Sequence, residues 1–97
     1  MLNQRQKAQL QALANPLAPI GQIGKAGLSE QLLIWLGDAL ELHELIKLRV
    51  LKTCPLANNE ISIELTRLLH CDLVQSIGSV IVLYRPSKEH KRIKLVK

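Results

Sequence analysis

The sequence predicts an α/β (α+β) fold of the order α-β-α-β-α-β-β, in which helices pack on one mixed four-stranded sheet. Three observations lead to this prediction. The chain has 97 residues, which is enough for one hydrophobic core and too few for two ordinary domains. Hydrophobic residues make up 47% and charged residues 22%, a balance typical of globular proteins. Segments of helical periodicity alternate with short strand-like runs. We therefore expect residues 1–97 to form a single domain.

The first predicted helix runs from Gln4 to about Ala14. Asn3 precedes it, and asparagine at that position caps a helix by accepting a hydrogen bond from a free backbone N–H. Asn15-Pro16 follows it, and proline ends a helix because it lacks a backbone N–H. The apolar residues expected to face the core are Leu10, Leu13 and Ala14.

A short strand over residues 20–23 leads to a second helix, which Ser29 caps and which ends near His43. Apolar spacing predicts that one stripe of this helix faces the core, and the stripe consists of Leu32, Leu33, Leu36, Ala39 and Leu40. Ile34 and Trp35 are then left on the flank of the helix or outside.

Residues 45–52 alternate between apolar and polar side chains, which is the pattern of a half-buried strand. The apolar face consists of Ile46, Leu48 and Val50. Lys47 and Arg49 lie on the opposite face, where we expect both cations to be accessible to solvent.

The second half of the chain predicts a third helix and a pair of strands. Asn58-Asn59 can start a helix that runs through Leu69. Residues 72–77 and 80–84 have the composition of strands, and Gly78-Ser79 between them suits a tight hairpin with glycine at its first position. The helix residues expected in the core are Ile61, Leu65, Leu68 and Leu69.

The excess of basic residues lies at the C-terminal end. The formal net charge is +5, and residues 1–84 hold equal numbers of acidic and basic side chains. The excess is therefore confined to Arg85 and a basic tail over residues 86–97. Clustered cations release condensed counterions when they bind phosphates, so the tail suits a polyanion. A tail that only keeps the protein soluble explains the charge equally well.

Gly24-Lys25-Ala26-Gly27 is the most informative short motif. Glycine at both ends lets the backbone approach a ligand closely, the next helix presents a positive dipole end, and Lys25 adds a charge at the tip. In RNA-binding KH domains a GXXG loop clamps the nucleic-acid backbone in this way. Taken alone, the motif is also explained by an ordinary turn between a strand and a helix.

Other kinds of site lack the residues they need. The glycines do not have the spacing of a dinucleotide or nucleoside triphosphate loop, and no nucleophile and base form a recognisable set. We therefore expect no enzymatic activity and no cofactor. Cys54 and Cys71 lack metal-site spacing, so we expect reduced thiols and no metal. Trp35 and Tyr84 are too few aromatic residues for the stacking platform of an RRM, so recognition should rest on phosphate and shape.

A set of longer motifs spans nearly the whole chain. They are Leu13-Ala14-Asn15-Pro16-Leu17, Ile23-Gly24-Lys25-Ala26-Gly27-Leu28, Ala39-Leu40, His43-Glu44-Leu45-Ile46-Lys47, and Ile77-Gly78 followed by Val82-Leu83-Tyr84-Arg85-Pro86. In order and spacing they resemble the CRM domain of bacterial YhbY-like proteins. The combination of the glycine loop, the HELIK segment and the LYRP ending is specific to that family.

The resemblance implies an RNA-binding domain similar in fold to the C-terminal domain of a bacterial translation initiation factor. It also implies a role in assembly of the large (50S) ribosomal subunit through binding of ribosomal RNA. The residues expected to bind RNA are Gly24, Lys25, Ala26, Gly27, Lys47, Arg49, Arg85, Lys88, Lys91 and Arg92. Ala26 and Trp35 stand where relatives of this family often have polar residues. An exposed Trp35 could stack on a base or dock a protein, and a partly buried packing role is the alternative.

We expect a cytoplasmic monomer whose partner is ribosomal RNA or a precursor of the large subunit. No apolar run approaches the roughly 20 residues that a membrane crossing needs, so no membrane contact is expected. The alternative is a protein-interaction module that docks an acidic ribosomal protein or assembly factor through the basic tail.

Overall fold

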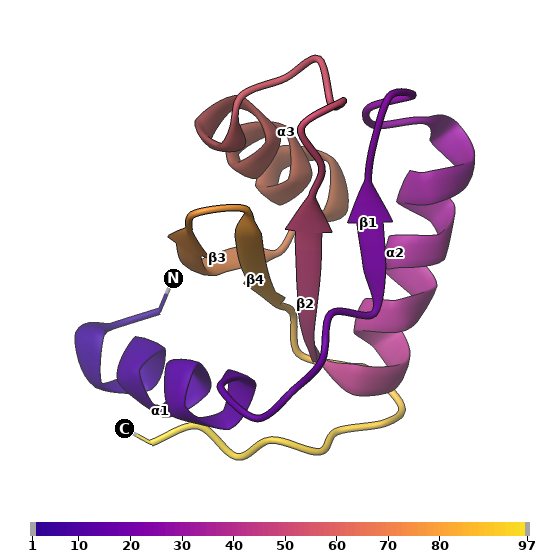
Figure 1. Ribbon diagram of the computed structural model, residues 1–97. Helices are drawn as coiled ribbons and strands as arrows, with labels where there is room; N and C mark the ends of the chain where they lie inside the picture. Colours follow the sequence, from indigo (N-terminus) through magenta and orange to yellow (C-terminus); the bar gives the residue numbers. More distant parts are fainter. Residues whose placement is uncertain (1, 97) are drawn as a thin grey trace.

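The computed structural model describes residues 2–96, and its elements follow the predicted order (Figure 1). The helices are α1 (Gln4–Ala14), α2 (Glu30–His43) and α3 (Asn58–Leu69), and the strands are β1 (Gly21–Ile23), β2 (Leu45–Val50), β3 (Asp72–Ile77) and β4 (Val80–Tyr84). The strands form one sheet in the order β1-β2-β4-β3, in which β1 and β2 are parallel and the other pairs are antiparallel. The prediction of a mixed four-stranded sheet is confirmed.

All three helices begin where the sequence predicts, but only two of them have a side-chain cap. Asn3 forms a capping box with Gln6 at the start of α1, and the Ser29 hydroxyl accepts a backbone hydrogen bond at the start of α2. At the start of α3 no side chain caps the helix. The Asn58 amide instead donates to the carbonyl of Gly78 and joins α3 to the β3–β4 hairpin.

The sheet has a core on each face. Helices α2 and α3 cover one face, and the larger core there includes Ile23, Leu36, Leu40, Ile46, Leu48, Ile61, Leu65, Ile81 and Leu83. Helix α1 covers the other face over a smaller core of Leu10, Ala14, Leu45, Val74, Val82 and Tyr84. Leu13 and Leu68 were expected in the core, and this prediction is wrong, because they lie on helix flanks and are 44% and 40% exposed.

The segment over residues 86–96, called the C-terminal segment below, has no regular secondary structure, yet it is docked on the domain. It runs alongside α1 in Figure 1. The amides of Gln6 and Gln9 donate to the backbone carbonyls of Val96 and Lys94 at 2.9 and 2.8 Å. Ile93 and Leu95 pack against the smaller core. The predicted basic tail is therefore part of the folded structure over the residues described, and Lys97 lies outside them.

Glu44 anchors this segment from inside the protein. Its side chain is 1% exposed, and its carboxylate accepts hydrogen bonds from the backbone N–H groups of Ser87, Arg92 and Ile93 at 2.7, 2.5 and 2.8 Å. Burial alone would raise the pKa of Glu44, but these N–H donors outweigh burial and the pKa lies below its usual value. Glu44 also has a φ of 64°, a backbone conformation that non-glycine residues seldom adopt.

Glu41, one turn earlier in α2, holds the start of the same segment. Its carboxylate accepts hydrogen bonds from the Ser87 hydroxyl at 2.5 Å and from the N–H groups of Lys88 and Glu89 at 3.2 Å. The Ser87 hydroxyl, followed by these N–H groups, lowers the pKa of Glu41 from 4.5 to about 2. The carboxylates of Glu41 in α2 and of Glu44, which caps its C-terminus, therefore bind the C-terminal segment through hydrogen bonds that only their ionised forms make fully.

We expect acid to weaken the docking of the C-terminal segment. Both carboxylates have a lower pKa in the folded protein than in the unfolded chain, so their contribution to stability is complete above the ordinary pKa of 4.5 and is lost as the pH falls through the folded-state pKa, which for Glu41 is about 2. Amide NMR signals of residues 87–96, followed from pH 6 to pH 2, should move toward random-coil positions over this range. In Ser87→Ala the Glu41 part of this change should begin at a higher pH. Signals that stay in place down to pH 2 would contradict the expected coupling.

Candidate nucleic-acid interface

The Gly24–Gly27 motif forms a tight turn at the carboxyl end of β1. The backbone N–H of Gly27 donates to the carbonyl of Gly24 at 2.9 Å, and Lys25 and Ala26 are exposed at the tip. Gly27 is buried and has a φ of +64°, and a Cβ at this position would lie 3.6 Å from Cγ of Pro55. The second glycine is therefore required by the conformation of the turn, while the residues at the tip are open to a ligand.

Replacing Gly27 should cost stability, because a side chain in the left-handed region is unfavourable by about 1–2 kcal/mol. The sequence suggests Gly27→Val as a test of whether a ligand approaches the backbone, provided that position 27 does not need a positive φ. The structure shows that Gly27 has a positive φ, so a valine there would also strain the turn. We expect Gly27→Ala to lower the free energy of unfolding by about 1–2 kcal/mol in urea titrations. Ala26→Gly at the exposed tip is the control and should change it by less. A Gly27→Ala protein as stable as the wild type would contradict the assigned turn geometry.

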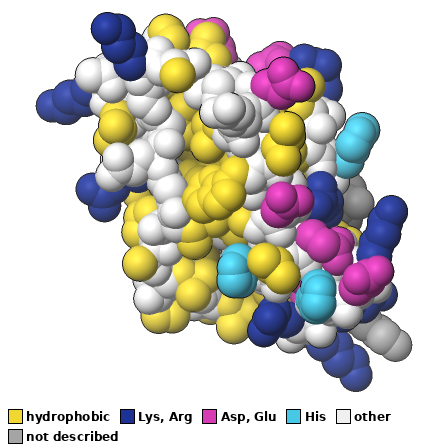
Figure 2. All heavy atoms as spheres, turned by 90° about the vertical axis from the view of Figure 1, so that its right-hand side faces the viewer, with side chains coloured by type: hydrophobic (Ala, Val, Ile, Leu, Met, Phe, Trp, Pro, Cys, Tyr) yellow, Lys and Arg dark blue, Asp and Glu magenta, His cyan; other side chains and the backbone are white. Residues whose placement is uncertain are grey.

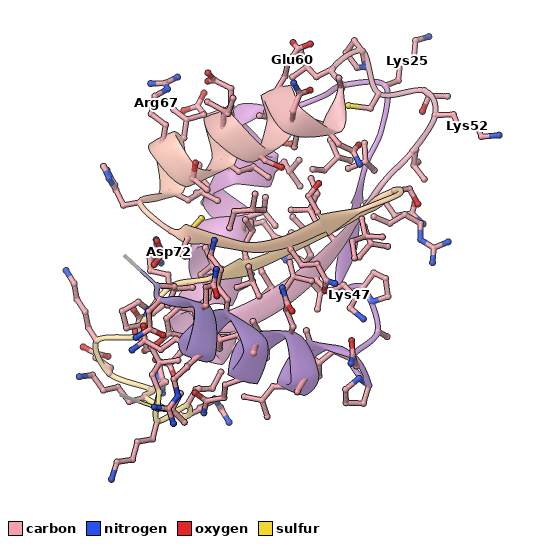
Figure 3. The ribbon with its side chains drawn as sticks, turned by 90° about the vertical axis from the view of Figure 1, so that its left-hand side faces the viewer. Lys25, Lys47, Lys52, Glu60, Arg67 and Asp72 are labelled. Carbon is pink, nitrogen blue, oxygen red and sulfur yellow. The ribbon has the colours of Figure 1, made fainter. Side chains whose placement is uncertain are left out.

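A second loop, residues 51–55 after β2, packs against the glycine turn. The parallel pairing of β1 and β2 brings their carboxyl ends together, and the N–H of Leu51 donates to the carbonyl of Ile23 at 2.8 Å. A Cβ at Gly24 would lie 3.3 Å from Cδ1 of Leu51. Lys52 and Lys25 consequently extend outward from the same end of the molecule (Figure 3). Sequence reasoning missed Lys52 as a site residue because it was assigned to the end of the strand.

The two cations of β2 share one face of the strand, as predicted, but differ in accessibility. Arg49 is exposed and borders a shallow hollow beside β1, together with Pro19, Ile20, Gly21 and Gln22. Lys47 is half-buried, and its Nζ lies 3.5 Å from the carbonyl of Asn15. Helix α1 and the connection after it cover the start of this face, so Lys47 is only partly accessible. The Gly24–Gly27 turn with Lys25, Arg49 and Lys52 is called the glycine-turn site below.

Arg85 lies between two helices and uses its guanidinium for contacts within the protein. Its guanidinium is half-buried and donates to the carbonyl of Leu69 at 2.9 Å and to that of Gly37 at 2.8 Å. These bonds connect the end of α3 to the middle of α2. Arg85 therefore uses hydrogen-bond donors to hold two helices in place.

The structure separates the predicted basic residues into two groups. The start of β2 pairs with the end of β4. The C-terminal segment therefore leaves the sheet at the opposite end of the strands from the glycine turn (Figure 1). The six residues of β2 separate these two ends by roughly 20 Å. The basic side chains on the C-terminal segment are Lys88, Lys91, Arg92 and Lys94, and each is exposed. Lys25 and Lys88 therefore do not belong to one continuous patch.

The surroundings of the two groups differ in charge. Figure 2 shows basic side chains along its left-hand edge, on the side of β1 and β2, whereas acidic and basic side chains mix at lower right. Within residues 2–96 the only salt bridge joins Arg67 to Glu64 at 2.5 Å. Glu60, at the start of α3, extends from the same end of the molecule as Lys25 (Figure 3), and its negative charge would repel a polyanion on the α3 side of the turn.

Cys54 is partly buried and Cys71 is buried, and both are free thiols. Burial raises the pKa of Cys71 to about 11, so its thiol stays protonated at neutral pH. Across residues 2–96, no group of three or more His, Cys, Asp or Glu side chains is placed to hold a metal ion. None of the helices described is long and apolar enough to cross a membrane.

Comparison with known proteins places the chain among close relatives. The model of the CRS1 / YhbY (CRM) domain matches residues 2–85. The chain is 42% identical over 95 residues to a Bacillus subtilis protein named "Probable RNA-binding protein YqeI", covering 98% of this chain and 99% of that one. It is 39% identical over 90 residues to a Haemophilus influenzae protein named "RNA-binding protein", covering 93% and 91% of the two chains.

A solved structure extends this similarity to three dimensions. The solution structure of a hypothetical protein from Staphylococcus aureus superimposes with a TM-score of 0.82 at 44% sequence identity, covering 99% of this chain and 100% of that one. The family model and the relatives span the glycine turn, all four strands and all three helices. The chain therefore belongs to the CRS1/YhbY (CRM) domain family.

Proposed function

We propose that this protein binds RNA, and that the glycine-turn site holds the sugar-phosphate backbone. The observation that carries the proposal is that the exposed cations Lys25 and Lys52 extend from the same end of the molecule as the glycine turn, with exposed Arg49 paired to Gln22 just before that turn. Two of the relatives named above carry the description RNA-binding protein, which supports the same class of ligand.

The chemistry of the site suits phosphate. Lys25 and Ala26 are exposed at the tip of the turn. The alanine and the two flanking glycines have small side chains or none, so a ligand can come close to the backbone there. Lysine and arginine next to the tip neutralise phosphates and release counterions, which gives affinity that depends little on base sequence. We therefore assign the main part of the binding free energy to Lys25, Arg49 and Lys52.

The cations of the C-terminal segment form a second and weaker contact in this proposal. Lys88, Lys91 and Arg92 are exposed, but the carboxylates of Glu41 and Glu89 lie in the same region and reduce the local positive potential. A long structured RNA can reach both groups of cations, whereas a short oligonucleotide reaches one. The second contact should therefore matter more for long RNA.

We further propose that the RNA is ribosomal and that the protein acts in assembly of the large (50S) subunit. Support comes from the motifs that resemble stand-alone bacterial CRM proteins, above all the glycine turn and the HELIK segment. The two named relatives are bacterial proteins, and this chain covers 99% and 91% of their lengths.

Crosslinking in cells, followed by sequencing of the bound fragments, tests the proposed target. The expected result is enrichment of large-subunit ribosomal RNA over its share of total RNA, and co-sedimentation with precursors of the large subunit. Fragments distributed in proportion to RNA abundance would contradict the ribosomal role. Capture of ribosomal proteins from nuclease-treated lysate by a protein that binds no RNA would support the protein-docking alternative instead.

A further inference from the structure

Trp35 is the single tryptophan of the chain and lies on α2 beside the edge strand β1. Its ring rests on the backbone of Gly21, where a Cβ would lie 2.7 Å from Cζ3 and 2.9 Å from Cη2. Any side chain at position 21 would displace the indole. Trp35 nevertheless stays 44% exposed, so contact with the strand fixes its position while nearly half of its surface meets water.

The indole lies close to the glycine-turn site. Gly21 begins β1, and three residues further on the chain enters the turn at Gly24, a distance of about 10 Å along the strand. Gly21 pairs with Leu48 and faces α2, whereas Gln22 pairs with Arg49 and faces the other side of the sheet. A strand of RNA that follows the outer edge of β1 from Lys25 would therefore have Arg49 on one side and Trp35 on the other.

The charges near Trp35 favour a base over a phosphate. Asp38, three residues further along α2, is exposed and would repel a phosphate on that side. An indole face is uncharged and stacks on any of the bases, because each has a π-face. Apolar side chains gather on this surface over α2 and β1 (Figure 2), so an unpaired base would also be removed from water there.

We propose that Trp35 stacks on an unpaired base of the RNA whose backbone is held at the glycine-turn site. The inference rests on the proposed RNA binding and adds to it a preference for single-stranded over duplex RNA. A base within a duplex is stacked on its neighbours and is not available to the indole. Gly21 positions Trp35 for this contact.

Fluorescence of Trp35 reports the contact directly, because no other tryptophan contributes. The full-length protein would be titrated with a single-stranded RNA oligonucleotide and with a duplex RNA of equal length, at the same salt concentration. We expect the single strand to quench the emission and the duplex to bind without comparable quenching. In parallel, Trp35→Leu should weaken single-strand binding by about 5- to 150-fold, the range for loss of one stacked base, and Trp35→Phe should weaken it less.

Ile34→Ala is the matched control, because Ile34 is an adjacent apolar residue that is 60% exposed and does not lie on Gly21. It should leave RNA affinity unchanged. Single-strand binding without quenching, or equal affinity for wild type and a folded Trp35→Leu protein, would overturn the stacking role and leave the proposed RNA binding intact. Absence of binding to either RNA would overturn both. Equal losses in Ile34→Ala and Trp35→Leu would indicate a general apolar contact and would also overturn stacking.

Discussion

Reversing the three charges of the glycine-turn site, as Lys25→Glu, Arg49→Glu and Lys52→Glu together, is expected to weaken RNA binding at least about 100-fold at 0.1 M salt. Each phosphate contact contributes about 0.7 to 0.9 to the slope of log K against log salt. Between 1 M and 0.1 M salt, one contact therefore raises the affinity by about 5- to 8-fold. Three lost contacts multiply to more than about 100-fold, and the slope should flatten by about 2 to 3.

The C-terminal segment provides a matched control for this variant. Lys88→Glu, Lys91→Glu and Lys94→Glu together produce the same change in net charge from three other exposed lysines. The side chains of these three lysines donate none of the docking hydrogen bonds described above, and Lys88 and Lys94 take part through a backbone N–H and a backbone carbonyl. We expect a loss smaller than about tenfold for a short RNA. Equal losses in the two variants would mean that RNA responds to net charge alone.

Glu44→Ala is expected to destabilise the protein by about 2–4 kcal/mol, because it leaves three backbone N–H groups without their charged acceptor. Once these bonds are gone, the C-terminal segment can detach, and Ile93 and Leu95 then leave the smaller core. Urea unfolding gives the change in free energy, and hydrogen exchange of residues 87–96 shows whether the segment has detached.

Three further variants separate the carboxylate from the backbone conformation. Glu44→Gln keeps the shape and one carbonyl acceptor, so it should be less destabilising than Glu44→Ala. Glu44→Gly loses the same hydrogen bonds as Glu44→Ala, but glycine adopts a φ of 64° without strain. Its loss of stability should therefore lie between those of Glu44→Gln and Glu44→Ala. Glu41→Ala, at a half-buried position of the same helix, should have a smaller effect. A Glu44→Ala protein within about 0.5 kcal/mol of wild type would contradict the anchoring role.

Much of the fold could be predicted from local signals. Asn3 and Ser29 cap their helices, and Gly78 lies at a hairpin turn with a φ of +58°, as its position in the sequence indicates. These features depend on neighbouring residues, so spacing and residue type suffice to predict them. The alternation in β2 likewise gave the correct faces.

The docking of the C-terminal segment could not be predicted in this way. A polar, basic run without periodicity resembles a free tail, and its partners Glu41 and Glu44 lie more than 40 residues earlier in the chain. Removing residues after Pro86 would therefore remove core contacts along with charges. Substitution of single lysines is the appropriate test of whether these charges contact RNA.

Only part of the site could be predicted, because some of its residues are neighbours in the sequence and others come together only in the fold. Lys25 and the glycines were identified because they form one continuous motif. Lys52 comes close to Lys25 through the parallel pairing of β1 and β2, which the sequence pattern does not specify. Arg85 has the residue type of a phosphate ligand, but its location under two helix carbonyls gives it a structural role.

The most direct test of RNA binding at the glycine-turn site is an NMR titration of the labelled full-length protein with a short single-stranded RNA. The largest changes in backbone amide signals should fall on residues 21–27 and 49–53, with small changes over residues 88–96. Changes confined to residues 88–96, with the glycine turn unaffected, would contradict the assignment of the main contact to Lys25, Arg49 and Lys52.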